Sequence, residues 1–157
     1  MPKITPFLWF DTQAEEAAQF YVSLFPNSKV TQVSRYPEGA PRPAGMAMTV
    51  SFMLDGAEFT ALNGGPDYSF DNAVSFVVHT RDQAETDHYY DALKDGGREH
   101  ACGWVQDRYG LAWQITPMRL MELVTDSDKA KAGRAMGAMM TMRKIDIAVI
   151  EAAAAAG

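Results

Sequence analysis

Hydrophobic positions recur at helical spacing in some stretches of this chain and form β-prone runs in others. The same order of these stretches occurs twice. In the first copy, a stretch with apolar side chains at helical spacing separates two β-prone runs, and two further runs flank Asp55-Gly56, a common hairpin turn. The four predicted strands cover residues 3–10, 28–36, 46–54 and 57–63. This copy is therefore expected to contain a strand, a helix and three strands.

The same order begins again after residue 72. Residues 73–80 have the pattern of an apolar strand, and Gly96-Gly97 is expected to end the helix that follows. Residues 102–117 then predict two strands joined by a turn at Asp107-Arg108-Tyr109-Gly110. The tripeptide Gln-Ala-Glu also occurs in both copies, about 70 residues apart. The repetition predicts two βαβββ units, at about 1–66 and 72–117, within one domain of residues 1–117.

Both predicted helices have a capping-box pattern at their start. Thr12 is followed by Glu15, and Asp82 is followed by Glu85, which are the spacings that satisfy the first free backbone N–H groups of a helix. We therefore expect each pair to cap its own helix.

Residues 118–157 predict a C-terminal helical extension that is rich in Met and Ala. Asp128 is its expected cap. A common helix face is predicted for Ala132, Met136, Met139, Met140 and Arg143. The polyalanine end, residues 152–156, has helix propensity but little to bury, so it is expected to fray. The extension is expected to pack over a sheet or across a dimer interface.

Charge and composition exclude several classes of partner. A net charge of -6 argues against binding to nucleic acid, which requires clustered Lys and Arg. No run reaches the roughly 18 apolar residues of a membrane span, and the N-terminus has no apolar signal region. The single cysteine, Cys102, cannot form an intramolecular disulfide, which is typical of a reducing compartment. We expect a cytoplasmic protein with no nucleic-acid or membrane partner.

Five segments carry a resemblance to a known family. They are FLWFDTQAEEAAQFYVSLFPNSKV, ALNGGP, SFVV, CGWVQDRYGLAWQITP and KAGRAMGAMMTMRKIDIA. They resemble the PhnB-like branch of the vicinal-oxygen-chelate superfamily, commonly labelled a "3-demethylubiquinone-9 3-methyltransferase" domain. The resemblance implies an α+β, glyoxalase/bleomycin-resistance-like fold of paired βαβββ units. It also implies half-barrels that enclose a pocket, and a homodimer.

The usual chemistry of that superfamily uses a divalent metal ion, held by His and Glu side chains, as a Lewis acid. Counting seven residues from Asp11, Asp82 and Asp107 gives three of the four corresponding positions, and the strand 57–63 offers the fourth. They are Ile4, Ser75, Gln114 and either Ala61 or Asn63. None is His, Asp or Glu, and a neutral amide binds transition metals weakly. The sequence therefore predicts no metal and no other cofactor, although a shift of one residue in register would turn different side chains inward.

Six side chains are candidates for lining a small-molecule pocket. They are Asn63, Ser75, His79, Trp104, Trp113 and Gln114. Strand alternation places Ser75 and His79 on one face, although a histidine bonded to a neighbouring loop is the favoured interpretation of His79. The two tryptophans can stack on a planar ligand or simply fill the core. Asn63 can cap a turn or present its amide to a ligand.

Alternation also places His100, Cys102 and Trp104 on one strand face. A metal pair of His100 and Cys102 would lack enough further ligands, so Cys102 is expected to be a small buried apolar residue. His88 is expected on the exposed side of its helix.

Three functions remain open at this point. The first is a small-molecule-binding protein without the superfamily's metal. The second is a metal-dependent lyase, dioxygenase or resistance-type enzyme. The third is a methyltransferase acting on a quinone-like substrate, as the family label suggests. Gly64-Gly65-Pro66 is followed by a polar loop, which is unlike the strand–glycine loop–helix of the common S-adenosylmethionine enzymes.

Overall fold

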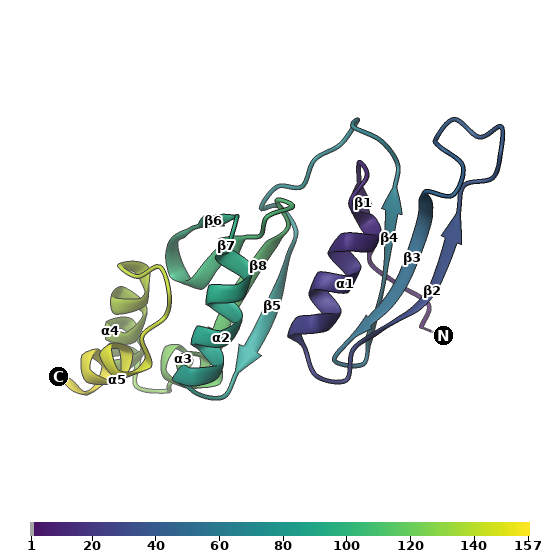
Figure 1. The fold of residues 1–157 in the computed structure, drawn as a ribbon. Helices are drawn as coiled ribbons and strands as arrows, with labels where there is room; N and C mark the ends of the chain where they lie inside the picture. Colours follow the sequence, from purple (N-terminus) through teal and green to yellow (C-terminus); the bar gives the residue numbers. More distant parts are fainter. Residues whose placement is uncertain (1) are drawn as a thin grey trace. The chain divides into compact units, whose positions relative to one another are not determined.

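A computed structural model describes residues 2–157, and its strands form two four-stranded sheets (Figure 1). The chain divides into two compact units, Met1–Ser69 and Phe70–Gly157, and each unit contains one of the sheets. The order of elements in each unit is the predicted βαβββ, and the second unit continues into the C-terminal helices.

The first unit consists of four strands and one helix. Their bounds are β1 Phe7–Phe10, α1 Ala14–Leu24, β2 Lys29–Arg35, β3 Ala47–Leu54 and β4 Ala57–Asn63. The sheet order is β1-β4-β3-β2, with β1 parallel to β4 and the other pairs antiparallel. The hairpin at Asp55-Gly56 is confirmed, because Leu54 pairs with Ala57 across it. The apolar stripe of α1 is buried against the sheet, where the Tyr21 ring stacks on Phe52.

The start of α1 differs from the prediction. Its N-cap residue is Gln13, whose side chain makes no capping hydrogen bond. Instead, the backbone N–H of Ala14 donates to Asn63 Oδ1, at the end of β4, over 2.8 Å. The predicted cap of Thr12 with Glu15 is therefore wrong, because a residue distant in sequence satisfies the helix start.

The second unit repeats this arrangement, but two of its strands, β6 and β7, are short. Its elements are β5 Ser75–Thr80, α2 Gln83–Lys94, β6 Arg98–Glu99, the 3₁₀ turn η1 Ala101–Gly103, β7 Trp104–Gln106 and β8 Ala112–Pro117. The sheet order is β5-β8-β7-β6, and β5 is parallel to β8. Here the capping box is confirmed, because Asp82 Oδ1 accepts from Glu85 N and Glu85 Oε1 accepts from Arg81 N. Gly96, at a φ of +74°, ends α2 as predicted.

Residues 101–103 do not continue a strand. Cys102 has a φ of +61°, and its N–H donates to the carbonyl of Met142, while Gly103 N–H donates to Arg143. Because this backbone bonds to the C-terminal extension, β7 begins only at Trp104. The predicted common strand face of His100, Cys102 and Trp104 is therefore wrong for Cys102, which is partly exposed. By contrast, His100 N–H donates to Trp104 O, and the His100 ring hydrogen-bonds to Gln106 on the face of Trp104.

The C-terminal extension forms three helices around a small core of its own. The helices are α3 Met118–Val124, α4 Lys129–Met140 and α5 Ile147–Ala155. The core contains Leu120, Leu123, Ala135, Ile145, Ile150 and Ala154. The predicted cap is confirmed, since Asp128 Oδ1 accepts from the N–H groups of Ala130 and Lys131. None of the helices in residues 2–157 has the length and apolar character that crossing a membrane requires.

Two expectations for this extension are wrong. The polyalanine end is helical up to Ala155, and Ala154 is buried because the Arg134 guanidinium donates to its carbonyl and the small core packs on it. The predicted shared face does not form, because α4 ends at Met140, before Arg143. Met136 and Met140 are exposed, whereas Ala132 is buried.

Polar contacts fasten the extension to α2. Gln83 uses both ends of its amide: Nε2 donates to Ile145 O, and Oε1 accepts from Ile147 N. Lys144 forms an ion pair with Asp91 at 2.8 Å, and its Nζ lies over the Tyr90 ring. Burial, followed by the hydrogen bond to Glu99, raises the pKa of Tyr90 above its usual range, so this phenol stays protonated and continues to donate.

Candidate functional site

The second sheet has one face covered by α2 and one face that the unit leaves accessible (Figure 1). Residues on the covered face include Val78, Val105, Trp113 and Ile115, and all four are buried. Strand alternation directs their neighbours to the other side. We call that side the open face and define it by Ser75, Val77, His79, Trp104, Gln106, Gln114 and Thr116. These side chains are partly buried or exposed.

Four of the six predicted pocket residues meet on the open face. Trp104 lies directly opposite Gln114 in the β7–β8 pair, and Gln114 pairs with Val77 of β5. The Gln114 side chain donates from Nε2 to Ser75 Oγ over 2.8 Å. His79 pairs with Thr116 in the next row of the same face. The register therefore brings together an indole, an amide, a hydroxyl and an imidazole.

Trp113 lies on the opposite side of the sheet. Only 3% of its surface is exposed, its Nε1 donates to Asp107 Oδ2 over 2.9 Å, and its ring packs against Phe76. Because Trp113 and Gln114 are adjacent in one strand, they point to different faces. Trp113 thus fills the core beneath α2, which was one of its two predicted roles.

Asn63 lies in the first unit and is 1% exposed. Its Oδ1 accepts from Ala14 N, and its Nδ2 donates to Ala47 O over 2.9 Å. The amide therefore joins the start of α1 to strands β3 and β4. A ligand-binding role for Asn63 stays a prediction, whereas its structural role is visible.

The residues after Asn63 are explained by the packing of Trp9. A Cβ on Gly64 would lie 2.5 Å from the Trp9 ring, so only glycine leaves room for the indole. Trp9 Nε1 donates to Gly65 O over 2.9 Å, and Tyr68 meets the ring edge-on. The ALNGGP segment thus forms a tryptophan-packing corner.

The three tryptophans differ in what their indole N–H groups do. Trp9 and Trp113 both donate within the fold. Trp104 is partly buried, yet within residues 2–157 its Nε1 makes no hydrogen bond and its ring pairs with no other aromatic ring. Sequence gives no signal for this difference, because it depends on which acceptors the fold places nearby. Trp104 is the tryptophan that retains an unused donor on the open face.

The turn at Asp107 fixes the relation of Trp104 to Gln114. Asp107 is 3% exposed, and its Oδ1 accepts from the N–H groups of Tyr109 and Leu111 at 2.9 and 3.1 Å. Gly110 N–H also donates to Asp107 O, which closes the predicted turn. The turn sets the register of β7 against β8. Asp107 therefore affects the site indirectly, by fixing the positions of Trp104 and Gln114.

The structure corrects the positions counted for a metal in the first unit. Ile4 precedes β1 and is 86% exposed, while Ala61 and Asn63 are buried on the side of the sheet that α1 covers. In the second unit, Ser75 and Gln114 do share the open face, and they bond to each other. Within residues 2–157, no three His, Cys, Asp or Glu side chains form a group that could hold a metal ion.

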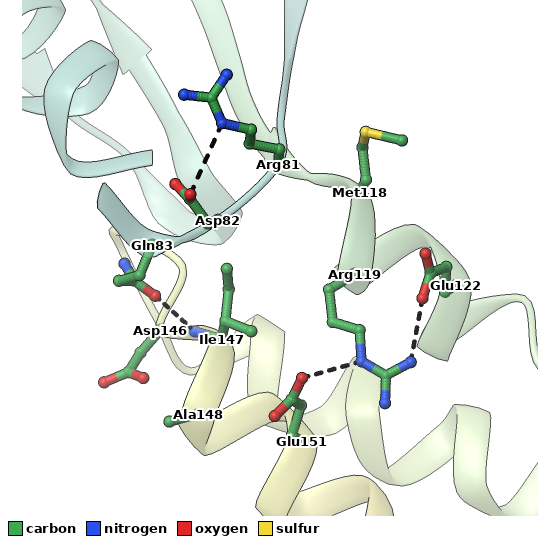
Figure 2. A pocket seen from close by; sticks show the side chains of 10 residues that line it. All are labelled: Arg81, Asp82, Gln83, Met118, Arg119, Glu122, Asp146, Ile147, Ala148 and Glu151. Carbon is green, nitrogen blue, oxygen red and sulfur yellow. Dashed lines mark hydrogen bonds and ion pairs between the residues drawn. The ribbon is translucent and has the colours of Figure 1, made fainter. Parts of the chain in front are cut away.

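A cavity of about 600 Å³ lies at the carboxyl ends of β5 and β8, where α2 and α3 begin (Figure 2). Figure 2 shows Arg119 in its wall, with Glu122 and Glu151 on either side at 3.1 and 3.0 Å. Two of the helix starts at this cavity have side-chain partners, since Asp82 caps α2 and Gln83 accepts from the first N–H of α5, while α3 begins after Pro117 without a side-chain cap. Its charged groups are paired within the fold, so we place the candidate site on the open face.

The comparisons with known proteins agree with this architecture. A model of the family described as 3-demethylubiquinone-9 3-methyltransferase matches residues 2–116. The chain belongs to this family. Residues 117–157, which include the three C-terminal helices, lie outside the matched range. No curated protein gives a significant match.

Solved structures extend the family relationship to the fold. A PhnB protein from Bacillus cereus, described with the same methyltransferase name, is 34% identical with a TM-score of 0.70 and covers 74% of this chain and 99% of its own. Protein PA1353 from Pseudomonas aeruginosa is 20% identical, with a TM-score of 0.61 and coverages of 74% and 98%. The fosfomycin resistance protein FosX from Mesorhizobium loti is 12% identical, with a TM-score of 0.50 and coverages of 72% and 90%. The last two matches show the fold alone.

These matches confirm the predicted superfamily and fold class. The family belongs to the vicinal-oxygen-chelate superfamily, and the chain has its α+β fold of paired βαβββ units, followed by a C-terminal helical extension. Family membership accounts for the two sheets and does not by itself assign a reaction.

Proposed function

We propose that this family member binds a small, uncharged, planar molecule on the open face of the β5–β8 sheet, without the metal ion of its superfamily. The observation that carries the proposal is the indole of Trp104. The Trp104 ring is partly buried, and within residues 2–157 its N–H has no protein partner, so both the ring and the donor remain available to a ligand. The N–H lies in the plane of the indole and is open to solvent, so a ligand can stack on the ring face or accept the N–H at the ring edge.

The other groups of the open face support an uncharged ligand. Strands β5, β7 and β8, which carry Ser75, Trp104 and Gln114, contain no Asp, Glu, Lys or Arg, and the edge strand β6 adds Arg98 opposite Gln106. Within residues 2–157, Gln114 Oε1 and the His79 ring make no hydrogen bond. Neutral donors and acceptors favour a neutral polar molecule, because a charged ligand would lose its hydration without gaining a counter-charge.

The same side chains support metal-independent binding. Ser75 and Gln114 occupy the superfamily's ligand positions on this sheet, and each satisfies the other through a hydrogen bond. A hydroxyl and a neutral amide are weak ligands for Zn²⁺, Ni²⁺ or Mn²⁺.

Metal content tests this half of the proposal. The purified chain, incubated with Zn²⁺, Ni²⁺ or Mn²⁺ and then desalted, is expected to retain far less than one ion per chain by elemental analysis. The double variant Ser75→His with Gln114→Glu is the matched control, since it places an imidazole and a carboxylate at the two positions and is expected to retain more metal. A stoichiometric ion in the unmodified chain would contradict the proposal and favour the metal-dependent enzyme.

A fragment screen tests the binding half. Uncharged planar fragments are expected to bind the unmodified chain and to lose most of their affinity for Trp104→Phe, which keeps an aromatic ring but removes the N–H donor. Trp9→Phe is the matched control, because Trp9 lies in the first unit and donates within the fold. Ligand-observed magnetic resonance measures the affinities. Equal binding by all three proteins would count against the open face.

The family description favours one further candidate, methyl transfer from S-adenosylmethionine. In the structure, Gly64-Gly65-Pro66 leads through a loop to β5 and not to a helix start, unlike the usual phosphate or nucleoside loop of doubly wound enzymes. Isothermal titration with S-adenosylmethionine separates the two functions: stoichiometric heat would favour methyl transfer, and no heat would favour the proposed binding role.

A further inference from the structure

We infer that the ligand of the open face carries an amide edge, meaning a ring carbonyl next to a ring N–H, as in a lactam or a pyrimidine-dione. This inference rests on the proposed function and narrows it to a chemical class. It is carried by the groups that Gln114 and Trp104 leave unpaired on neighbouring strands.

The Gln114 amide has capacity left after its contact with Ser75. An amide side chain has two N–H donors and one carbonyl acceptor. One N–H donates to Ser75 Oγ, and within residues 2–157 the second N–H and Oε1 have no partner. The amide thus keeps one N–H donor and its carbonyl acceptor, both in the amide plane. The group that matches them is another amide edge, which offers an acceptor and a donor at the same spacing.

Trp104 adds a flat surface and a second donor beside this edge. Directly opposed residues of an antiparallel pair have Cβ atoms about 4.5–5.5 Å apart, and Trp104 is directly opposite Gln114. A ring lying against the indole can therefore reach Gln114 with its edge. The Trp104 N–H lies in the plane of the indole, so it can donate only to a group that extends past the ring edge and not to the stacked ring itself.

Other ligand classes fit these groups less well. A carboxylate or phosphate would need a guanidinium or ammonium group beside Gln114, and the guanidinium of this sheet, Arg98 of β6, is opposite Gln106 in another row. A molecule with two vicinal oxygens would bind by chelating a metal ion. The residues at the positions counted for metal ligands on this sheet are Ser75 and Gln114, whose hydroxyl and neutral amide bind metals weakly. A pure hydrocarbon ring would bury Gln114 Oε1 and the Trp104 N–H without partners, which costs free energy.

A pair of matched probes tests the amide edge. 2-Pyridone carries the edge, and N-methyl-2-pyridone has the same ring and carbonyl but no N–H. 2-Pyridone is expected to shift the Trp104 indole and the Gln114 side-chain amide signals in a nitrogen–proton correlation spectrum. N-methyl-2-pyridone is expected to bind about three- to tenfold more weakly, the ratio that one hydrogen bond supplies. In Gln114→Met, an unbranched side chain of similar length, the two probes are expected to bind equally.

Each outcome decides the inference. Equal binding of the two probes to the unmodified chain would overturn the amide edge and leave binding on the open face intact. The same holds if neither pyridone binds while other planar fragments shift the Trp104 signal. If no planar fragment shifts that signal, both the inference and the proposed function fail. A preserved amide spectrum of Gln114→Met confirms that the variant is folded, so a loss of discrimination reports on the contact.

Discussion

Replacing Asp107 with alanine is expected to lower the free energy of unfolding by about 3–5 kcal/mol. The carboxylate is 3% exposed and accepts from two turn N–H groups and from the Trp113 indole. Alanine would leave these three donors unpaired in a buried place, and each unpaired donor costs about 1–3 kcal/mol. Urea unfolding, followed by tryptophan fluorescence, measures the loss.

Two further variants show whether the contacts cause the effect. Asp107→Asn keeps an oxygen for the turn but turns an NH₂ group toward a neighbouring donor, so its loss is expected to be intermediate. Asp95→Ala is the surface control, because the Asp95 side chain is 80% exposed and its ion pair with Arg108 is a surface contact. A loss for Asp107→Ala no larger than that of Asp95→Ala would show that the turn does not depend on this carboxylate.

Gly97→Ala is expected to destabilise the chain by about 3 kcal/mol. A Cβ at this position would lie 2.1 Å from Gln106 O and 2.8 Å from the Asp107 carbonyl carbon. Both are backbone atoms, so the chain after α2 must move away from β7, which disturbs the strand that carries Trp104. Thermal unfolding is expected to show a lower midpoint.

The matched control is Gly133→Ala, in the middle of α4. An added Cβ there meets nothing within 4 Å, and alanine has the higher helix propensity, so this variant is expected to gain about 0.5–1 kcal/mol. The two glycine variants should therefore change stability in opposite directions. A neutral Gly97→Ala would mean that the approach of Gly97 to Gln106 is looser than in the structure.

The parts of the fold that sequence predicts correctly depend on local chemistry. The Asp55-Gly56 hairpin, the Asp82 cap of α2 and the glycine that ends α2 all involve residues a few positions apart. The start of α1 instead depends on Asn63, 49 residues from Ala14. Thr12 and Glu15 have suitable spacing, but the N-cap residue is Gln13, and a tertiary partner accepts from the first N–H of the helix. Local propensity cannot reveal such a competitor.

The candidate site shows the same division. Alternation predicts that Ser75 and His79 share a face, and the Asp107 turn brings Gln114 and Trp104 to it. The same alternation directs Trp113 and Gln114, which are adjacent in β8, to opposite faces. The two side chains were predicted to line one pocket because of their residue types, without regard to this alternation. The unused N–H of Trp104 could not be predicted, since it depends on acceptors that only the folded chain brings near.

The extension differs from the sequence-based expectations because its partners are distant. Polyalanine has little to bury on its own, yet Arg134 and the core around Leu120 give Ala154 a packed environment. Residues 101–103 alternate like a strand but bond to the backbone at Met142 and Arg143. In both places, a segment at least 19 residues away decides the local structure.

The predicted homodimer stays a prediction.

The indole N–H of Trp104 gives the most direct test of ligand binding on the open face. A nitrogen–proton correlation spectrum resolves the indole signals of Trp9, Trp104 and Trp113, and Trp104→Phe assigns the signal of Trp104. Addition of uncharged planar fragments is predicted to shift the Trp104 signal while the Trp9 and Trp113 signals stay in place, because those two N–H groups already donate within the fold. Fragments that bind the chain but leave the Trp104 signal unmoved would contradict the account.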